Sequence, residues 1–402
     1  MEKRDRVVPL PAMPESAWES PFLQRVLSVF AARSEAPAPF FFGAAVWAAG
    51  LAVGHHVALR YGLALRLNFF VALIGPTGVK KTSAIEPLTR LLRHVAPDVV
   101  QLYGASTAEG LLQVMGKQPS TVASVIENEL AVYLAKTKSR DSILMPMSCR
   151  LFDGPPRVDL PTRADPIVAE NPMFSMIGAS TRAAIENQIG EAEQLGGLLN
   201  RFCFFAGERQ PPIPFPGGAS DSEWDALVGE LADVRDNYGS VTWLEIRDPE
   251  ARRLWEEYYH GVYERQARLP EIICGLTSRE HVHVMKFAMM FCVLRGGREI
   301  IAEDIGRAVE LGAYQFAVIE SVVAPIGQGA ASRLDARIEE FLSERAMTRR
   351  ELHQRLSGRV KSRDLNSALA TLLDLDRIAE LDGGLLAWTD AEYFQRRRAG
   401  AA

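Results

Sequence analysis

A glycine-rich turn between an apolar run and a helical run constrains this chain more than any other feature. Residues 67–74 (LNFFVALI) are aromatic and branched, as in a strand buried on both faces of a parallel sheet. The turn GPTGVKKT follows at 75–82, and a helical pattern begins near Lys81 and continues through TSAIEPLTRLLRHV. This order of strand, tight turn and helix predicts a βα unit of an α/β sheet.

The turn matches the pattern GxxxxGK[ST] except at one position. In that pattern glycines let backbone N–H groups face phosphates, the lysine neutralises the β and γ charges, and the hydroxyl binds Mg²⁺. Gly75, Gly78, Lys81 and Thr82 fill these roles, so we expect ATP and Mg²⁺ to bind here. A structural turn that carries two lysines is the alternative. The expected binding residues are Gly75, Pro76, Thr77, Gly78, Val79, Lys80, Lys81, Thr82 and Ser83.

Lys80 stands where the pattern has its second glycine. A side chain is accommodated at this point only if the backbone stays near an α-type conformation, because glycine alone tolerates the other conformations at low cost. The Lys80 ammonium also adds positive charge beside a bound triphosphate.

A second apolar run, 121–127 (TVASVIE), is followed at once by polar residues. Triphosphate hydrolysis needs one group that holds Mg²⁺ through water and another that polarises the attacking water. Asn128 falls at the metal position and Glu129 at the catalytic position, with Glu127 beside them. Asn128 carries no charge, so either Glu127 compensates or intrinsic hydrolysis is slow. A solvated acidic loop is the alternative.

A third apolar run, 172–178 (PMFSMIG), leads to Ser180 and Thr181. A hydroxyl at this strand end can sense the γ-phosphate or orient water, and Thr181 is the candidate. The alternative is that it caps the following helix. Strands that alternate with helices predict a doubly wound parallel sheet, which binds ligands at the carboxyl ends of its strands.

Arg201 precedes a further apolar run in GGLLNRFCFF (196–205). Its position at the end of an element predicts a side chain that is free to point outwards. An arginine delivered to a neighbouring subunit's γ-phosphate stabilises the transition state and makes hydrolysis depend on assembly. A salt bridge at a strand start is the alternative. Arg279, at the start of a long helical pattern, is a second arginine that can touch a γ-phosphate.

Stretches rich in proline and glycine divide the chain. We interpret residues 1–65 as an N-terminal lead and helical collar, 66–210 as the ATPase core, 219–327 as an all-α lid and 333–392 as a winged helix. The last assignment rests on three short helical patterns before a DGG turn at 382–384, which lies between apolar runs and indicates a β-hairpin.

Composition limits the partners and the compartment. The net charge is −5 and the pI is about 5.9, so DNA contacts need local basic patches. The four cysteines are widely spaced, which suggests neither a zinc site nor a disulfide framework and fits a reducing cytosol. The longest apolar stretch, 40–54, is about 15 residues, too short to span hydrocarbon. We expect a soluble, cytoplasmic protein with no membrane partner.

Basic residues gather in two places that suit DNA. The first surrounds a Gly-Pro-Pro turn between the second and third apolar runs, where a hairpin would face the pore of a ring and follow single-stranded DNA. Its candidates are Lys136, Lys138, Arg157 and Arg163. The second is the winged helix, where Lys361 and Arg363 begin a helical pattern suited to duplex DNA. The alternatives are an interface hairpin with paired arginines and a lid that contacts protein.

Five segments stand in the order seen in primase-helicase-type P-loop ATPases of phages and mobile elements, and the chain resembles that family over roughly residues 20–390. The segments are GPTGVKKT, VIENELAVYL, LFDGPPRVDLPTR, MFSMIGAST and GGLLNRF. The family is a divergent branch of the AAA+ ring ATPases, and LLNRF is similar to the arginine-finger segment of minichromosome-maintenance helicases. The resemblance implies a hexamer-like homo-oligomeric ring with Arg201 as the finger. Lys80 and Asn128 depart from the family pattern.

Two functions follow as expectations. The first is an ATP-driven DNA helicase or translocase in phage or mobile-element replication. The second is an ATP-dependent DNA-binding switch with little turnover, such as an initiator, loader or defence component, which Lys80 and Asn128 favour. Many relatives carry a primase domain that is not visible here, so a primase in a separate chain fits as a partner. A small-molecule kinase is disfavoured, because the chain has a large lid and a winged helix instead of a compact acceptor site.

Overall fold

Five parallel strands form the central sheet, in the spatial order β4-β5-β8-β3-β9. The strands are β3 (Phe70–Ile74), β4 (Val100–Tyr103), β5 (Val122–Glu127), β8 (Met173–Ser180) and β9 (Phe202–Ala206). β3, β8 and β9 are buried along their whole length, which explains why their sequences are apolar without alternation. β3 lies between β8 and β9, so its carboxyl end lies between the carboxyl ends of two parallel neighbours.

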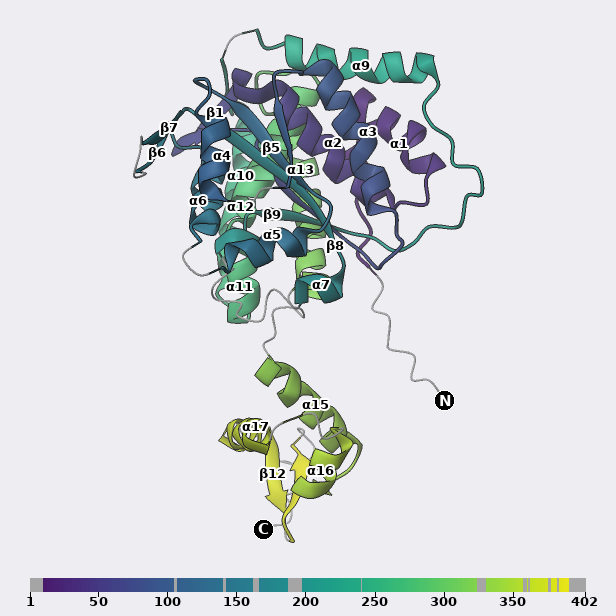
Figure 1. The fold of residues 1–402 in the computed structure, drawn as a ribbon, viewed down its shortest axis with the longest axis vertical. Helices are drawn as coiled ribbons and strands as arrows, with labels where there is room; N and C mark the ends of the chain where they lie inside the picture. The colour runs from purple at the N-terminus through teal and green to yellow at the C-terminus, as the bar shows by residue number, and fades with distance from the viewer. Residues whose placement is uncertain are drawn as a thin grey trace. The chain divides into compact units, whose positions relative to one another are not determined.

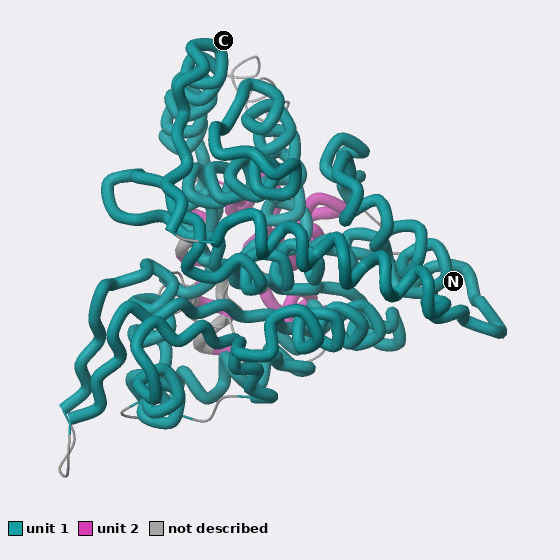
Figure 2. Tube along the Cα trace, turned by 90° about the horizontal axis from the view of Figure 1, so that it is seen from above, with its two compact units in different colours: residues 1–326 teal, residues 327–402 magenta. Residues whose placement is uncertain are grey.

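The structure is a computed structural model. It describes residues 10–104, 107–139, 142–161, 166–186, 197–239, 241–323, 330–356, 360, 362–374, 377–381 and 383–389. The chain divides into two units, residues 1–326 and residues 327–402, which Figure 2 shows in different colours.

Helices cover both faces of the sheet in the first unit (Figure 1). One face carries α1 (Pro21–Val29), α2 (Ala38–Val53) and α3 (Lys81–Val95), and the other carries α4 (Ala108–Met115), α5 (Leu130–Thr137) and α6 (Leu144–Phe152). The remaining long helices are α9 (Asp221–Asp236), α10 (Pro249–Gln266), α12 (Glu280–Leu294) and α13 (Ala302–Val318). The predicted α/β class with a parallel sheet is confirmed, and the two helical layers are compatible with a doubly wound core.

Helix α2 is the most apolar of the long helices of the first unit. Gly43 permits its close approach to the sheet, because a β-carbon there would lie 2.7 Å from the ring of Phe205. Among the described residues, the segment Ala38–His56 alone has the length and apolarity of a membrane span, and 83% of it is buried inside the protein. Such burial is typical of a core helix.

A small second sheet overturns part of the expected helical collar and lid. Residues 57–65, predicted to be helical, form β1 (Val57–Tyr61) and β2 (Leu63–Leu65), joined at Gly62 with a φ of 71°. β1 also pairs in parallel with β10 (Thr242–Leu244), a strand inside the predicted all-α lid. Short apolar runs cannot be assigned to helix or strand by periodicity alone, and here the pairing of distant segments decided the outcome.

The second unit has its own apolar core, which includes Ile338, Leu352, Leu369 and Leu386. Its helices are α15 (Ala330–Glu344), α16 (Arg349–Arg355) and α17 (Ser362–Asp374). Its sheet has the order β11-β13-β12, with β11 (Met347–Thr348), β12 (Ile378–Leu381) and β13 (Leu385–Trp388). The three helices and the hairpin predicted for this segment are therefore present. Gly383 and Gly384 take positive φ at the hairpin turn, while Asp382 lies outside the described residues.

Candidate functional site

The loop at residues 75–80 joins the end of β3 directly to α3. The Gly75 N–H donates to the Ser180 carbonyl oxygen at 3.2 Å, which ties the loop to the end of β8. The N-cap residue of α3 is Lys80, whose ammonium is a hydrogen-bond donor and therefore cannot cap the first-turn amides. First-turn amides of a helix are donors suited to an anion, so this end of α3 can receive one.

The backbone of Lys80 is in the left-handed helical region, with φ 56° and ψ 36°. This is the region that glycine occupies at low cost, whereas another residue loses about 1–2 kcal/mol there. Gly78 also has a positive φ of 82°. The loop therefore keeps a backbone conformation typical of glycine at position 80, although the residue is lysine.

Lys81 folds back into the curve of the loop. Its Nζ donates to the carbonyl oxygens of Gly75 at 2.9 Å and Pro76 at 2.8 Å. Burial lowers the pKa of Lys81, and the negative charge of Glu129 raises it in part. Thr82 and Ser83, the next two residues of α3, have exposed side chains. A cation thus lies within the loop, with hydroxyl groups beside it.

The end of β5 brings acidic and amide groups to the same edge of the sheet. Asn128 and Glu129 are exposed, while the Oε2 atom of Glu127 is buried without a hydrogen-bond partner. Burial raises the pKa of the Glu127 carboxyl above its ordinary value. The structure therefore brings Asn128 and Glu129 to the edge that carries the loop.

At the end of β8, the hydroxyl of Thr181 accepts from the Ala184 N–H at 3.1 Å. Thr181 therefore caps α7 (Arg182–Glu186), which was the alternative interpretation. Its neighbour Ser180 lies opposite Ile74 of β3, and the Ser180 Oγ is buried without a hydrogen-bond partner. Ser180 is thus the better candidate for ligand contact at this strand end.

A cavity of about 840 Å³ adjoins the loop through Lys80 and Ser83. Phe30, Phe41 and Trp224 supply aromatic walls. Its volume lies within the range of about 300–1,000 Å³ typical of small-molecule sites. No local pattern in the sequence indicates this cavity, because its walls come from three separated parts of the chain.

Two polar contacts hold the proline-rich segment 208–220 over this cavity. The Ile213 N–H donates to Glu35 at 3.1 Å, and this hydrogen bond is the main reason that the pKa of Glu35 is lowered. Arg33 donates to the Gly218 carbonyl oxygen at 3.3 Å and also pairs with Glu223 at 2.6 Å, just beyond the segment. The prolines indicated only the end of the sheet, but the segment also closes the cavity.

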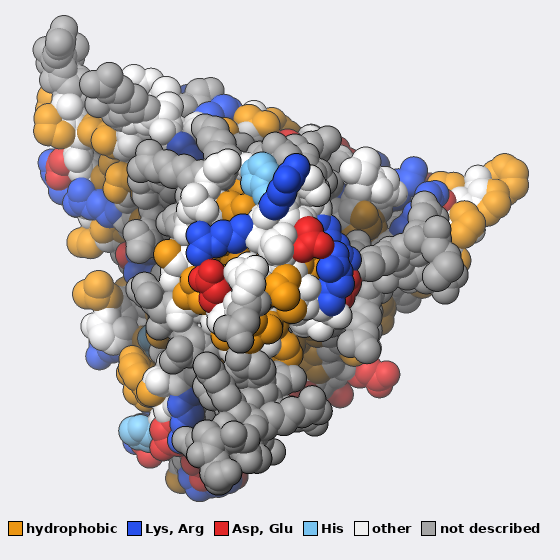
Figure 3. Space-filling model, turned by 90° about the horizontal axis from the view of Figure 1, so that it is seen from below, with side chains coloured by type: hydrophobic (Ala, Val, Ile, Leu, Met, Phe, Trp, Pro, Cys, Tyr) orange, Lys and Arg blue, Asp and Glu red, His pale blue; other side chains and the backbone are white. Residues whose placement is uncertain are grey.

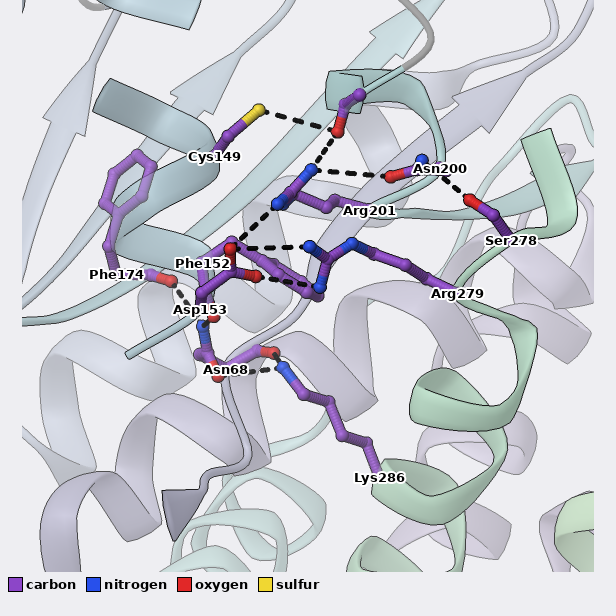
Figure 4. Close-up of polar contacts among 11 residues, drawn as sticks. Asn68, Cys149, Phe152, Asp153, Phe174, Asn200, Arg201, Ser278, Arg279 and Lys286 are labelled. Atoms are coloured by element: carbon purple, nitrogen blue, oxygen red, sulfur yellow. Dashed lines mark hydrogen bonds and ion pairs between the residues drawn. The ribbon is translucent and has the colours of Figure 1, made fainter. Parts of the chain in front are cut away.

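Arg201 does not point outwards, contrary to the prediction. Its side chain is 9% exposed, and its guanidinium binds Asp153 Oδ2 at 2.8 Å (Figure 4). Arg279 binds Asp153 Oδ1 at 2.8 Å from the start of α12. The alternative interpretation, a salt bridge at a strand start, is what the structure has. Since Arg201 precedes β9 and the loop follows the parallel strand β3, they lie at opposite edges of the sheet.

Lys286 lies near the Asp153 cluster and is 1% exposed. Its Nζ donates to the backbone and side-chain oxygens of Asn68 at 2.6 and 2.8 Å, as Figure 4 shows, and lies 3.9 Å from the centre of the Phe152 ring. Burial lowers the pKa of Lys286 to about 7. Sequence reasoning missed this lysine and Asp153. The only signal was the aspartate before the Gly-Pro-Pro turn.

The predicted hairpin exists as β6 (Arg157–Leu160) and β7 (Ile167–Glu170), at one side of the first unit (Figure 1). Arg157 binds Asp159 at 2.7 Å and Glu170 at 2.5 Å, so its charge is already paired with acids. This agrees with the alternative of a hairpin with paired arginines.

The other DNA candidates are scattered. Lys136 lies in the last turn of α5, where its charge partly offsets the rise that burial causes in the pKa of Glu127, and Lys138 is the C-cap residue of that helix. Arg163 and Lys361 lie outside the described residues. Arg363 belongs to α17, and only its backbone is described. The face drawn in Figure 3 mixes basic and acidic side chains instead of presenting one sign of charge.

Among the described residues, no group of three or more His, Cys, Asp and Glu side chains is arranged to hold a metal ion. A scan against models of known protein families finds no match, and a search of curated protein sequences finds no significant relative. The family resemblance therefore rests on the five sequence segments alone.

Proposed function

We propose that this protein binds ATP at the 75–83 loop and couples its hydrolysis to movement along DNA, as a helicase or translocase. One observation carries the proposal. The Lys81 ammonium lies in the curve of a glycine-containing loop, where it donates hydrogen bonds to two backbone carbonyls that follow β3. A triphosphate is the ligand that such an ammonium and the adjoining helix amides suit best.

The cavity beside the loop supports a nucleotide over a simple anion. With phosphates at Lys81, the base and ribose would extend past Ser83 towards Trp224 and Phe30. Arg90 lies over the Trp224 ring, 4.6 Å from its centre, which holds that ring in place. Aromatic walls with a few polar groups are typical of a site for a planar base.

The oxygen groups around the loop fit Mg²⁺. Thr82 and Asn128 would hold the ion together with phosphate oxygens, and the ion would neutralise charge on the triphosphate. The buried Oε2 of Glu127, which has no partner, is a further oxygen at this edge. Glu129 would act as the general base towards water.

A ring of subunits is part of this proposal. Arg201 would reach the γ-phosphate of a neighbour, because it lies at the sheet edge opposite its own loop. Single-stranded DNA would pass the β6–β7 hairpin, duplex DNA would contact α17 of the second unit as a winged helix, and a primase would come from a separate chain. Four cysteines that form no disulfide suit the cytoplasm, where we expect this protein to act.

The second candidate is an ATP-dependent DNA-binding switch with little turnover. The pairing of Arg201 with Asp153 favours it, since a finger held in this way cannot serve a neighbour until the ion pair breaks. The uncharged Asn128 favours it as well.

Steady-state ATP hydrolysis with and without single-stranded DNA separates the two candidates. For the motor, DNA stimulates turnover, and Lys81→Ala and Arg201→Ala each abolish it. For the switch, the wild type binds ATP but DNA produces no turnover. Lys117→Ala removes an exposed lysine elsewhere and should match the wild type. Absence of ATP binding by the wild-type protein would contradict both candidates.

A further inference from the structure

Aromatic side chains form a row along α10. Trp255, Tyr259 and Tyr263 recur every fourth residue, so they lie on one face of the helix over about 12 Å. Successive ring centres are 6.1 and 4.9 Å apart. Tyr61 of β1 joins the row, with its ring centre 5.9 Å from that of Trp255. Aromatic stripes on helices usually belong to a core, but Tyr263 is 50% exposed and Trp255 and Tyr259 are half-buried.

A second aromatic platform lies on β10. Trp243 is 41% exposed, and the guanidinium of Arg60 lies over its ring, 5.1 Å from the centre. Tryptophan and arginine together present a flat stack at the surface. Trp243 and Trp255 line the same hollow, of about 760 Å³, so the platform and the row share one depression.

A smaller hollow of about 260 Å³ shares Tyr61 with the larger one. The two hollows are lined by five arginines and three carboxylates, in a chain whose net charge is −5. The arginines are Arg60, Arg66, Arg247, Arg252 and Arg279.

Three of these arginines contact neutral groups, and none of the three forms an ion pair with a carboxylate among the described residues. Arg60 lies over the Trp243 ring, Arg66 donates to the His55 carbonyl oxygen, and Arg252 donates to the Ile246 carbonyl oxygen. Their positive charges therefore remain available to an anionic ligand.

We infer that this surface, formed by the two hollows and the aromatic row of α10, binds single-stranded DNA. Unpaired bases offer flat faces that stack on aromatic rings and guanidinium planes with little regard to sequence. The phosphates of the same strand match the excess of arginine. A duplex hides its base faces, so it cannot use the aromatic row. The inference rests on the proposed action on DNA but concerns residues outside the hairpin and α17.

The path of such a strand leads to the proposed motor. Asp153 and Gly154 line the smaller hollow, where the chain leaves α6 for the β6–β7 hairpin. A strand held in both hollows would therefore arrive at the base of that hairpin. The surface would hold the DNA strand beside the β6–β7 hairpin, which is the element proposed to move along DNA.

The test measures the affinity of the full-length protein for labelled oligo-deoxythymidylate of about 20 nucleotides, enough to cover the row and both hollows. The double variant Arg60→Ala/Trp243→Ala should bind at least about tenfold more weakly and reduce the slope of log affinity against log salt by about one. Tyr263→Ala, at an exposed site on another element, should weaken binding about tenfold independently.

A matched control uses another arginine and aromatic pair at the surface. Arg93 donates to the hydroxyl of Tyr103, which is 55% exposed on β4, at 2.9 Å. Arg93→Ala/Tyr103→Ala should bind the oligonucleotide as the wild type does. Equal losses in this control and in Arg60→Ala/Trp243→Ala would overturn the inference.

Binding is measured without nucleotide, which separates this inference from the proposed function. If Lys81→Ala loses ATP binding but keeps oligonucleotide affinity, and Tyr263→Ala does the reverse, both stand. Unchanged affinity in both surface variants would overturn the inference and leave ATP binding intact. A change in sedimentation of these variants without a change in DNA affinity would assign the surface to a second copy of the chain, and would also overturn it.

Discussion

The carboxyl and amino edges of the central sheet use charge in opposite ways. At the carboxyl edge, Lys81 donates to carbonyl oxygens of its own loop, and within the described part of the chain the buried Ser180 Oγ and Glu127 Oε2 have no hydrogen-bond partners. At the amino edge, the carboxylate of Asp153 binds two guanidinium groups at 2.8 Å each. The carboxyl edge surrounds a lysine ammonium with backbone oxygens, while the amino edge pairs charge with charge inside the same chain, although among the described residues Arg201 Nε is also buried there without a hydrogen-bond partner.

This difference indicates which edge awaits a ligand. A buried polar group without a partner costs about 1–3 kcal/mol, so a fold that keeps two of them at one edge gains when a ligand supplies the partners. An ion pair that is complete within the chain gains nothing from a ligand and must first be broken. The carboxyl edge is therefore suited to a phosphate ligand, whereas the ion pairs of the amino edge hold its elements together.

The largest expected effect comes from Lys81→Ala. A hydrogen bond from a charged group contributes about 1.5–3 kcal/mol, so ATP affinity should fall by roughly one to two orders of magnitude. Isothermal titration with ATP and Mg²⁺ measures the change. Lys138→Ala, at the end of α5, is the control and should bind ATP normally. Equal affinity in Lys81→Ala and the wild type would show that the carboxyl edge is not the phosphate site.

Asp153→Asn tests the amino edge. It removes the charge that pairs with both Arg201 and Arg279, and Arg201 is buried, so the free energy of unfolding should fall by about 1–3 kcal/mol, less than for a fully buried pair because Asp153 is partly exposed. Urea denaturation measures the change, and ATP affinity should stay constant.

The control for that variant is Asp159→Asn, which disturbs the exposed pair with Arg157. Exposed pairs contribute about 0–1 kcal/mol, so its effect on stability should be small. If Asp153→Asn were as mild as Asp159→Asn, the amino edge would not depend on its internal ion pairs.

Lys286→Met tests whether burial at the amino edge favours the neutral form of the Lys286 amine. Folded Lys286 has a pKa of about 7, against an ordinary value of 10.5. Between these values the unfolded chain binds more protons, so wild-type stability rises with pH. Lys286→Met lacks this proton, and its stability relative to the wild type should therefore fall from pH 7 to pH 10. Amide hydrogen exchange in β3 and β8 at several pH values follows this difference. A constant difference would mean that Lys286 keeps its ordinary pKa.

The smallest effect is expected for Lys80→Gly. Glycine adopts the left-handed backbone of position 80 at low cost but loses more entropy on folding, so stability should rise by no more than about 1 kcal/mol. The thermal unfolding midpoint gives this change, with Lys117→Gly as a control at a site of negative φ. A clear loss of stability would show that the Lys80 side chain stabilises the loop enough to outweigh its backbone strain.

Local sequence predicted the carboxyl edge better than the amino edge. The loop and the ends of β5 and β8 follow from patterns of a few consecutive residues, because a parallel sheet brings its strand ends to one edge. The hairpin of the second unit follows from turn residues between two apolar runs. Arg201 failed as an outward-pointing residue because its partner, Asp153, is far away in the sequence. The β1–β2–β10 sheet was missed for the same reason, since its parallel pairing joins residues 57–59 to residues 242–244.

What the sequence determined by itself was the α/β class, the order of strand, turn and helix around Gly75, and the residues that reach the carboxyl edge. Tertiary structure alone decided that Lys80 takes a left-handed backbone, that Arg201 is held by Asp153, and that a cavity and an aromatic surface exist. The physical reason is range. Backbone propensity and apolar periodicity act between near neighbours, whereas burial and ion pairing depend on which distant segments the fold brings together.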